Sequence, residues 1–126
     1  MAFLLAGCAS QTAQRCPVGQ EPHRTAQLFF GQRSQGRPWV SETVFRKFVD
    51  EELTTRFPDG LTVMEGGGQW KGRDDKLIRE AAKVVLIVLP KGDDAQGRLD
   101  AVRQAYRARF DQDAVLRVDP PACAPS

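Results

Sequence analysis

The amino-acid sequence predicts an α+β domain in which a four-stranded antiparallel sheet carries two helices on one face. Three observations lead to this class. The chain has 126 residues, which is enough for one hydrophobic core and too few for two. Hydrophobic residues make up 41% of it and charged residues 27%, as in ordinary folded domains. Apolar residues follow first the period of a strand and then that of a helix, in the order strand, helix, strand, strand, helix, strand.

The first half of the chain predicts a strand and a helix. Thr25 to Gly31 (TAQLFFG) is apolar and aromatic and ends at a glycine, which is typical of a strand. Ser41 is placed to cap a helix. The apolar residues that follow it at helical spacing are Val44, Phe45, Phe48, Val49 and Leu53. We expect this helix to end before Phe57-Pro58, because a proline forces the preceding residue into an extended conformation.

The second half predicts a long hairpin, a second helix and a last strand. Leu61 to Lys71 and Leu77 to Leu89 are the two arms of the hairpin, joined by a polar turn centred near Asp74. The second arm ends in VVLIVL, a run typical of a central strand buried on both faces. The acidic pair Asp93-Asp94 starts the second helix, and Ala114 to Val118 is the last strand. The stripe of the second helix comprises Leu99, Val102, Tyr106, Arg109 and Phe110.

Two strand-helix-strand units in this order fit the ferredoxin-like β-α-β-β-α-β architecture, with the strands ordered 4-1-3-2 and both helices on one face. We expect this domain to occupy residues 24–119. A truncated lipoprotein signal segment at 1–7 and a flexible tether at 8–23 precede it, and a tail at 120–126 follows.

The N-terminus resembles a lipoprotein signal. Leu5-Ala6-Gly7-Cys8 is similar to a bacterial lipobox, which implies cleavage after Gly7 and a lipid on Cys8. A secretory signal normally begins with a basic segment, so we expect the true start codon upstream. Ala9 after the cysteine favours the outer membrane, which predicts a lipoprotein on the periplasmic side of that membrane. A buried strand or a frayed end is the alternative interpretation.

With Cys8 assigned to lipid, Cys16 and Cys123 remain as a pair. In the predicted topology the first and last strands are neighbours, so these two cysteines flank the same end of the sheet. A disulfide between them is expected in an oxidising compartment. Two free thiols in a cytosolic protein remain the alternative.

Charge and residue spacing exclude several functions. Lys plus Arg exceed Asp plus Glu by 18 to 16, and a net charge of +2 is too small to drive binding to nucleic acid. No apolar run reaches the roughly 20 residues that span a membrane. The single histidine, His23, lies in the expected tether, which argues against a histidine-dependent catalytic triad. We expect neither a metal nor a cofactor, because the cysteines are far apart and have no histidine neighbours.

The segment from Glu65 to Trp70 (EGGGQW) is the most unusual in the chain. Phosphate-binding glycine loops lead into a helix, whereas here a strand resumes. A turn centred near Asp74 would pair Glu65 with Lys83, Gly67 with Ala81 and Trp70 with Ile78. Small residues on both strands would then leave a shallow groove. The expected ligand-binding residues are Trp70, Gln69, Glu65, Glu80, Lys83 and Arg79.

Two plainer interpretations of this segment stay open. The glycines could serve only to bend the hairpin, and Glu65 and Lys83 could form an ordinary cross-strand ion pair.

Five segments of the chain together resemble a known family. They are FFGQ, FPDGLTV, GGGQW, REAAKVVLIV and AYRARFDQDAVLRVD. They are similar to a bacterial family of small secreted or lipoprotein-like domains, domain of unknown function 3574. The resemblance covers roughly Arg24 to Asp119. The matching positions are Gly60, Leu61, Thr62, Gly68, Gln69, Trp70, Glu80 and Lys83. It implies the same fold and an envelope location, and it implies no activity.

Three functions follow as hypotheses. The first is a lipid-anchored envelope domain that binds a small molecule or an envelope protein at the glycine-rich hairpin and has no chemistry of its own. The second is a small cofactor-free enzyme of the dimeric ferredoxin-like type, a fold-level analogy that implies a homodimer. The third is a structural module that docks by an edge strand.

Overall fold

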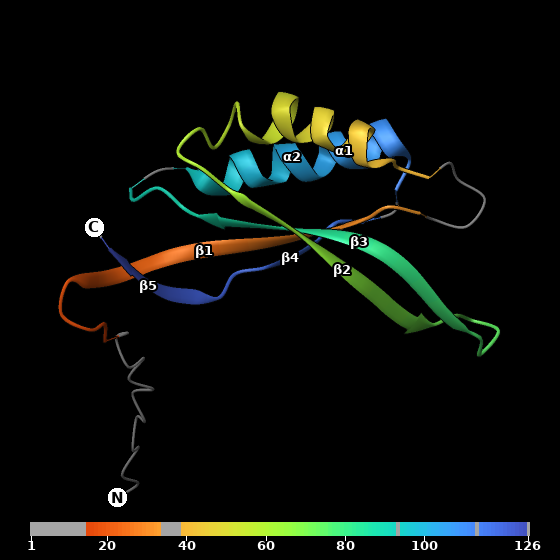
Figure 1. Ribbon diagram of the computed structural model, residues 1–126, viewed down its shortest axis with the longest axis horizontal. Coiled ribbons are helices and arrows are strands. Elements are labelled where there is room, and N and C mark those ends of the chain that lie inside the picture. Colours follow the sequence, from red (N-terminus) through yellow and green to blue (C-terminus); the bar gives the residue numbers. More distant parts are fainter. Residues whose placement is uncertain (1–14, 34–38, 93, 113, 126) are drawn as a thin grey trace, which may run out of the picture.

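The chain folds into two layers, a sheet and a pair of helices packed on one of its faces (Figure 1). The computed structural model describes residues 15–33, 39–92, 94–112 and 114–125. The elements in chain order are β1 (Gln20–Gly31), α1 (Glu42–Phe48), the π-helical turn η1 (Val49–Leu53), β2 (Thr62–Lys71), β3 (Leu77–Val88), α2 (Ala95–Phe110), β4 (Leu116–Val118) and β5 (Pro121–Pro125). The predicted α+β class, with an antiparallel sheet and two helices, is confirmed.

The strands of the main sheet lie in the order β2-β3-β1-β4. β1 is central, since Leu28 pairs with Val85 of β3 on one side and with Arg117 of β4 on the other. The first residues of β1 pair with β5, where His23 lies opposite Ala122. β2 pairs with β3, and its other side forms an edge of the sheet within the described part of the chain.

Both ends of the domain carry strands that the sequence did not predict. β1 begins at Gln20, inside the expected tether at 8–23, and β5 occupies most of the expected tail at 120–126. These strands have no alternating apolar pattern, and they form because each supplies backbone hydrogen-bond partners to the other. The disulfide between Cys16 and Cys123, with a Cα–Cα distance of 5.5 Å, closes the same end. The predicted disulfide is thus supported, and it joins Cys16, before β1, to Cys123 in β5.

The first helix is shorter than its apolar stripe. The Ser41 hydroxyl caps α1 by accepting a hydrogen bond from the N–H of Val44 at 3.2 Å. α1 then continues as η1, where the N–H of Thr54 donates to the carbonyl of Val49 at 2.9 Å. This wider turn keeps the later part of the stripe against the sheet.

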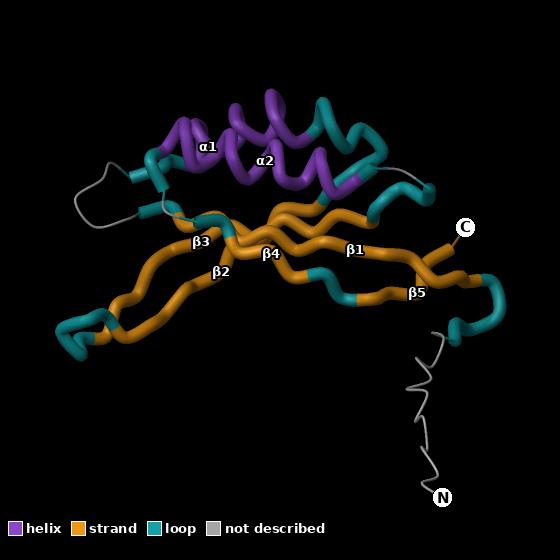
Figure 2. Tube along the Cα trace, turned by 180° about the vertical axis from the view of Figure 1, so that it is seen from behind, coloured by secondary structure: helices purple, strands orange, loops and turns teal. Residues whose placement is uncertain are grey.

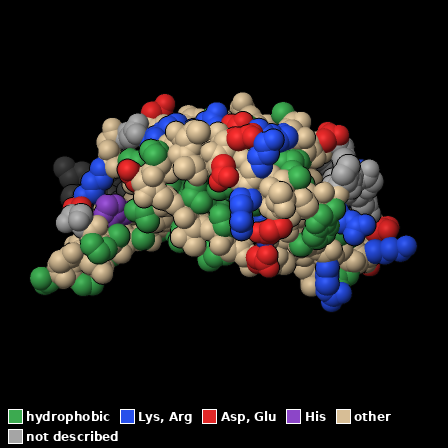
Figure 3. Space-filling view, turned by 45° about the horizontal axis from the view of Figure 1, so that its top comes forward, with side chains coloured by type: hydrophobic (Ala, Val, Ile, Leu, Met, Phe, Trp, Pro, Cys, Tyr) green, Lys and Arg blue, Asp and Glu red, His purple; other side chains and the backbone are tan. Residues whose placement is uncertain are grey.

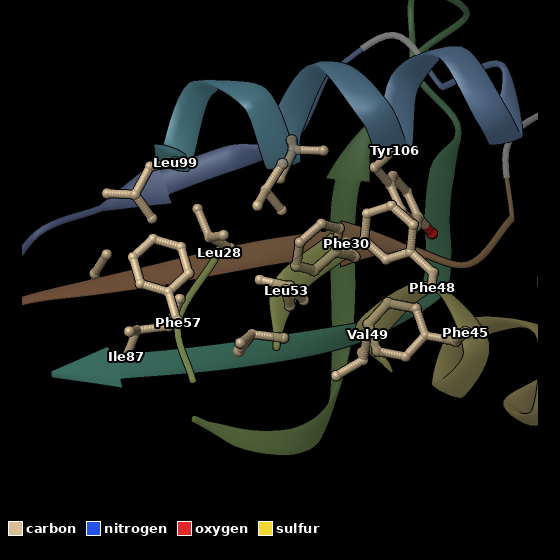
Figure 4. Packing of buried hydrophobic residues seen from close by; sticks show 14 of the residues in the cluster. Leu28, Phe30, Phe45, Phe48, Val49, Leu53, Phe57, Ile87, Leu99 and Tyr106 are labelled. Carbon is tan, nitrogen blue, oxygen red and sulfur yellow. The ribbon is translucent and has the colours of Figure 1, made fainter. Parts of the chain in front are cut away.

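The core between the layers is built around an aromatic cluster (Figure 4). The ring of Phe30 on β1 lies edge-on to the rings of Phe45, at 5.5 Å between centroids, and Tyr106, at 4.7 Å. Tyr106 also donates its hydroxyl hydrogen to the carbonyl of Gly31 at 2.5 Å. Burial of the phenol, helped by the nearby Glu80 carboxylate, raises the pKa of Tyr106. The cluster joins the central strand to both helices.

The helices cover one face of the sheet and leave the other open (Figure 2). On β3, Val85 and Ile87 face the helices and are 0% and 1% exposed, whereas Val88 is 49% exposed. The prediction that this run is buried on both faces is wrong, because both crossovers place their helices on the same side.

The surface on the helix side of the molecule is charged. Figure 3 shows Lys and Arg side chains interspersed there with Asp and Glu side chains. Within the described residues, no helix is long and apolar enough to cross a membrane.

Candidate functional site

The candidate site lies on the hairpin formed by β2 and β3. The two strands pair in the expected register, with Glu65 opposite Lys83 and Gly67 opposite Ala81. The far half of the hairpin extends beyond the helices (Figures 1 and 2). The glycine-rich part of β2 therefore runs from the edge of the helix layer out along the free arm.

Side chains on a strand point alternately to its two faces, and this alternation divides the six expected ligand residues into two groups. Glu65, Gln69, Arg79 and Lys83 lie on the helix side, and Trp70 and Glu80 lie on the opposite side. A Cβ on Gly68 would lie 3.8 Å from the Trp70 ring, so the indole packs across that glycine on the open side. Trp70 lines neither hollow of the hairpin, so the prediction that it shares a groove with the helix-side residues is wrong.

Lys83 is the centre of the helix-side group. Its side chain is 2% exposed although it carries a charge. Its ammonium donates hydrogen bonds to Glu42 at the start of α1 and to Glu65 on β2, the latter at 2.7 Å. The bond to Glu42, followed by that to Glu65, raises the pKa of Lys83, and the bond to Lys83 lowers the pKa of Glu65. Lys83 and Glu65 therefore stay ionised at neutral pH, and one ammonium is shared by two carboxylates.

A cleft of about 240 Å³ opens beside this ion cluster. Trp39, in the segment leading to α1, forms one wall and is 53% exposed, so its indole face is accessible. Gln32 lies in the lining at 6% exposure and donates a hydrogen bond to the carbonyl of Val40 at 3.4 Å. The full lining consists of Gln32, Trp39, Glu42, Glu65, Gly66, Ala81, Ala82 and Lys83.

A second hollow of about 420 Å³ continues along the hairpin and shares Gly66 and Ala81 with the cleft. Gly67 leaves it unobstructed, since a Cβ at this position would meet nothing within 4 Å. At the far end the Nε of Arg79 donates to the Oε1 of Gln69 at 3.1 Å. The two hollows together are called the hairpin groove, and its helix-side residues are Trp39, Glu42, Glu65, Gly67, Gln69, Arg79 and Lys83.

Glu80 borders the second hollow and also has a structural role. Its Oε1 accepts a hydrogen bond from the N–H of Arg33 at 2.8 Å. A Cβ on Gly31 would lie only 2.8 Å from the same oxygen, so glycine is what allows this carboxylate to approach β1. Glu80 thereby fixes the end of β1 against β3.

The two cysteines expected to form a disulfide lie away from the hairpin groove. Cys8 falls outside the described residues. Cys16, Cys123 and His23 lie at the other end of β1. In the described ranges, no group of three or more His, Cys, Asp or Glu residues could hold a metal ion.

Trp39, Gln32 and Glu42 were not predicted as site residues. The contact of Glu42 with Lys83 on the hairpin depends on how α1 lies on the sheet. One signal was available in the sequence. Lys83 has the same strand phase as the buried Val85 and Ile87, and a buried ammonium needs a carboxylate partner from the helix layer.

The fold and the groove define an α+β domain with an open, charged groove at one end of its sheet. A family model described as protein of unknown function (DUF3574) matches residues 25–125. The chain belongs to this family, which confirms the resemblance seen in the sequence. No curated protein matches the chain.

Two solved structures share the fold. A phage SAM lyase in complex with S-methyl-5′-thioadenosine is similar with a TM-score of 0.60 and 17% identity, over 90% of this chain and 95% of that chain. A phage SAM lyase in the apo state gives a TM-score of 0.59 and 15% identity, over 91% and 97% of the two chains. At these identities the similarity concerns the fold alone.

Proposed function

We propose that this protein is a lipoprotein of the bacterial cell envelope whose ferredoxin-like domain binds a small molecule in the hairpin groove. The observation that carries the binding proposal is the buried Lys83 ammonium at the wall of an open cleft. Its two partners remain accessible, since the Glu42 and Glu65 side chains are 61% and 82% exposed. Their outer oxygens are therefore available to a ligand.

The groove favours a ligand that has a positive charge beside an apolar or aromatic part. Two carboxylates share one ammonium, which leaves an excess negative charge at the cleft. The exposed Trp39 face on the other wall can bind a cation or stack on a ring. Lys83 itself is a poor general base, because its pKa is raised and it stays protonated.

Membrane attachment through Cys8 is supported by the Leu-Ala-Gly-Cys motif and by the disulfide, which is typical of oxidising compartments. Because Cys16 is bound to Cys123, only eight steps of chain separate the lipid from the domain. Such a segment reaches about 26 to 29 Å when extended. The hairpin groove lies at the opposite end of β1 and would stay accessible on the periplasmic side of the outer membrane.

Intact-mass spectrometry of the protein extracted from bacterial envelopes tests the anchor. We expect loss of residues 1–7 and the added mass of a diacylglycerol and an acyl chain. A Cys8→Ser variant is the control and should keep its N-terminus and lack the lipid mass. An unmodified wild-type protein in the soluble fraction would contradict the lipoprotein proposal.

A second candidate is an enzyme that acts on a sulfonium nucleoside. The similarity to the phage SAM lyase favours it, together with the match between a sulfonium cation and an acidic cleft beside an indole. The exposed carboxylates of Glu42 and Glu65 are the residues that would contact such a cation.

Isothermal titration calorimetry with SAM, a cation, and S-methyl-5′-thioadenosine, its neutral thioether relative, tests the ligand class. We expect SAM to bind more tightly and Glu65→Gln to weaken SAM binding selectively. Glu21→Gln is the matched control, because Glu21 pairs with Lys91 at the far end of β1. Equal affinity for both compounds, or no effect of Glu65→Gln, would refute the cation-binding proposal. Loss of SAM over time in the same mixture would distinguish an enzyme from a binding protein.

A further inference from the structure

β2 presents a long, unpaired backbone edge. It is the outermost strand of the sheet in the described part of the chain and is ten residues long. The N–H of Gly72 donates to the carbonyl of Lys76, so even-numbered residues of β2 bond to β3 and odd-numbered residues direct their backbone groups outward. The outward residues are Val63, Glu65, Gly67, Gln69 and Lys71. Such an edge is a template for another strand.

We propose that a second copy of this chain occupies the edge, with β2 pairing antiparallel to β2 about a two-fold axis at Gly68. This inference goes beyond the proposed function and depends on neither the lipid nor the ligand. A two-fold axis brings the same patch of both copies together, so the patch must complement itself.

Charge complementarity selects the register. With Gly68 opposite itself, Glu65 of each copy faces Lys71 of the other, which forms two opposite-charge pairs across the axis. Shifting the axis to Gly67 places Glu65 opposite Gln69 and Lys71 opposite Val63, so no charge is paired. Shifting it to Glu65 places two carboxylates opposite each other. Both side chains reach the surface, since Glu65 and Lys71 are 82% and 67% exposed, and each already has one ion-pair partner on the hairpin, Lys83 and Asp75.

The register with Gly68 on the two-fold axis also leaves room for the side chains on the open face of the sheet. Trp70 of one copy lies opposite Gly66 of the other, where the absent side chain leaves room for the indole. Four outward-facing residues of each strand, Glu65, Gly67, Gln69 and Lys71, then exchange about eight backbone hydrogen bonds. Because Glu65 belongs to both the edge and the hairpin groove, dimer formation and cation binding at Glu65 would oppose each other.

Cross-linking tests the register. In a Cys8→Ser background, Gly68→Cys would place its sulfur across the axis from itself, at a Cα–Cα distance of about 4.5 Å that permits a disulfide. Gly66→Cys is the matched control on the same face, where the two cysteines would lie about 13 Å apart along the strand. We expect a covalent dimer of the first variant under mild oxidation and none of the second. Equal cross-linking of both, or none of either, overturns the proposal, and cross-linking only in a mixture of the two variants overturns the register.

Exchanging the charges of Glu65 and Lys71 tests the two proposed ion pairs between the copies. Sedimentation equilibrium should show the wild-type dimer, and Lys71→Glu alone or Glu65→Lys alone should weaken it by about tenfold. An equimolar mixture of the two variants restores both opposite-charge pairs and should form a heterodimer of near wild-type affinity. Circular dichroism melting checks that each variant is folded. Lys71→Glu is the more conservative change, because the Lys71 ammonium pairs with the exposed Asp75 at 3.1 Å, whereas Glu65 pairs with the buried Lys83. A monomeric wild-type protein, or a mixture no tighter than its components, contradicts the proposal.

Discussion

The ion cluster at Lys83 should respond asymmetrically to substitution. Lys83→Met removes the ammonium and keeps the length of the side chain, and the two carboxylates left behind are mostly exposed and can be hydrated. Replacing both Glu42 and Glu65 by glutamine instead leaves a charged lysine side chain that is 2% exposed without either of these carboxylate partners. The two changes should lower the free energy of unfolding by different amounts, because the Lys83 side chain is buried and the two glutamate side chains are exposed.

The burial of Lys83 determines how much stability each variant should lose. Loss of one partner from a buried ion pair costs about 3 to 5 kcal/mol when an uncompensated charge stays inside. The Lys83 ammonium lies just beneath two surface carboxylates, which places the double-glutamine variant at the lower end, about 3 kcal/mol. Lys83→Met leaves no buried charge and conserves volume, so its cost should stay under about 1.5 kcal/mol.

Urea unfolding followed by circular dichroism measures both free energies of unfolding. The slope of the transition should be unchanged, so that the midpoint reports stability alone. Glu21→Gln, at the other end of the sheet, is the control for a surface carboxylate. If Lys83→Met cost as much as the double-glutamine variant, or if the latter unfolded with the wild type, the argument from lysine burial would be refuted.

Three further outcomes are expected. Replacing Cys16 and Cys123 by serine opens a bridge across a sequence separation of 107 and should lower stability by about 2 to 5 kcal/mol, seen as a lower melting temperature; an unchanged temperature would contradict a stabilising role. Phe30→Ala empties a site that is 0% exposed and should cost about 3 to 5 kcal/mol in urea, with an unaltered midpoint as the opposing result. The lowered pKa of Glu65 gives stability that is present above its ordinary value of 4.5 and lost as the pH falls. The raised pKa of Lys83 gives stability that is lost as the pH rises above 10.5. Melting temperatures across pH should show both losses, and Lys83→Met should reduce them.

The hairpin register could be predicted because a strong turn signal and a run of small residues leave one consistent pairing. The same register also shows that Trp70 and Glu65 lie on different faces of the hairpin, which the groove prediction overlooked. Glu65 and Trp70 are five positions apart, and an odd separation on a strand always places two side chains on opposite faces. The strand itself was predicted correctly, and the error concerned the face of the strand on which Trp70 lies.

Other features could not be predicted from local patterns. Trp39 lies beside the hairpin where Glu42, at the start of α1, bonds to Lys83 of β3, and such a tertiary contact has no periodic signal in the sequence. β5 contains prolines and short side chains, and the start of β1 contains Pro22 among long polar side chains. Their strand conformation comes from mutual pairing and from the disulfide. The length of β3 was predicted well. Which of its faces is exposed depends on the face of the sheet against which both helices pack.

The two tryptophans allow one direct test of the binding proposal, because Trp39 lies in the hairpin groove and Trp70 lies on the opposite face. Each indole N–H gives its own signal in a ¹H–¹⁵N correlation spectrum, and Trp70→Phe assigns the pair. On titration with SAM we predict that the Trp39 signal shifts in step with the backbone amides of Glu65 and Lys83, while the Trp70 signal stays in place. A shift of Trp70 without Trp39, or no shift of either indole at saturating SAM, would contradict the assignment of the groove as a site for cationic ligands.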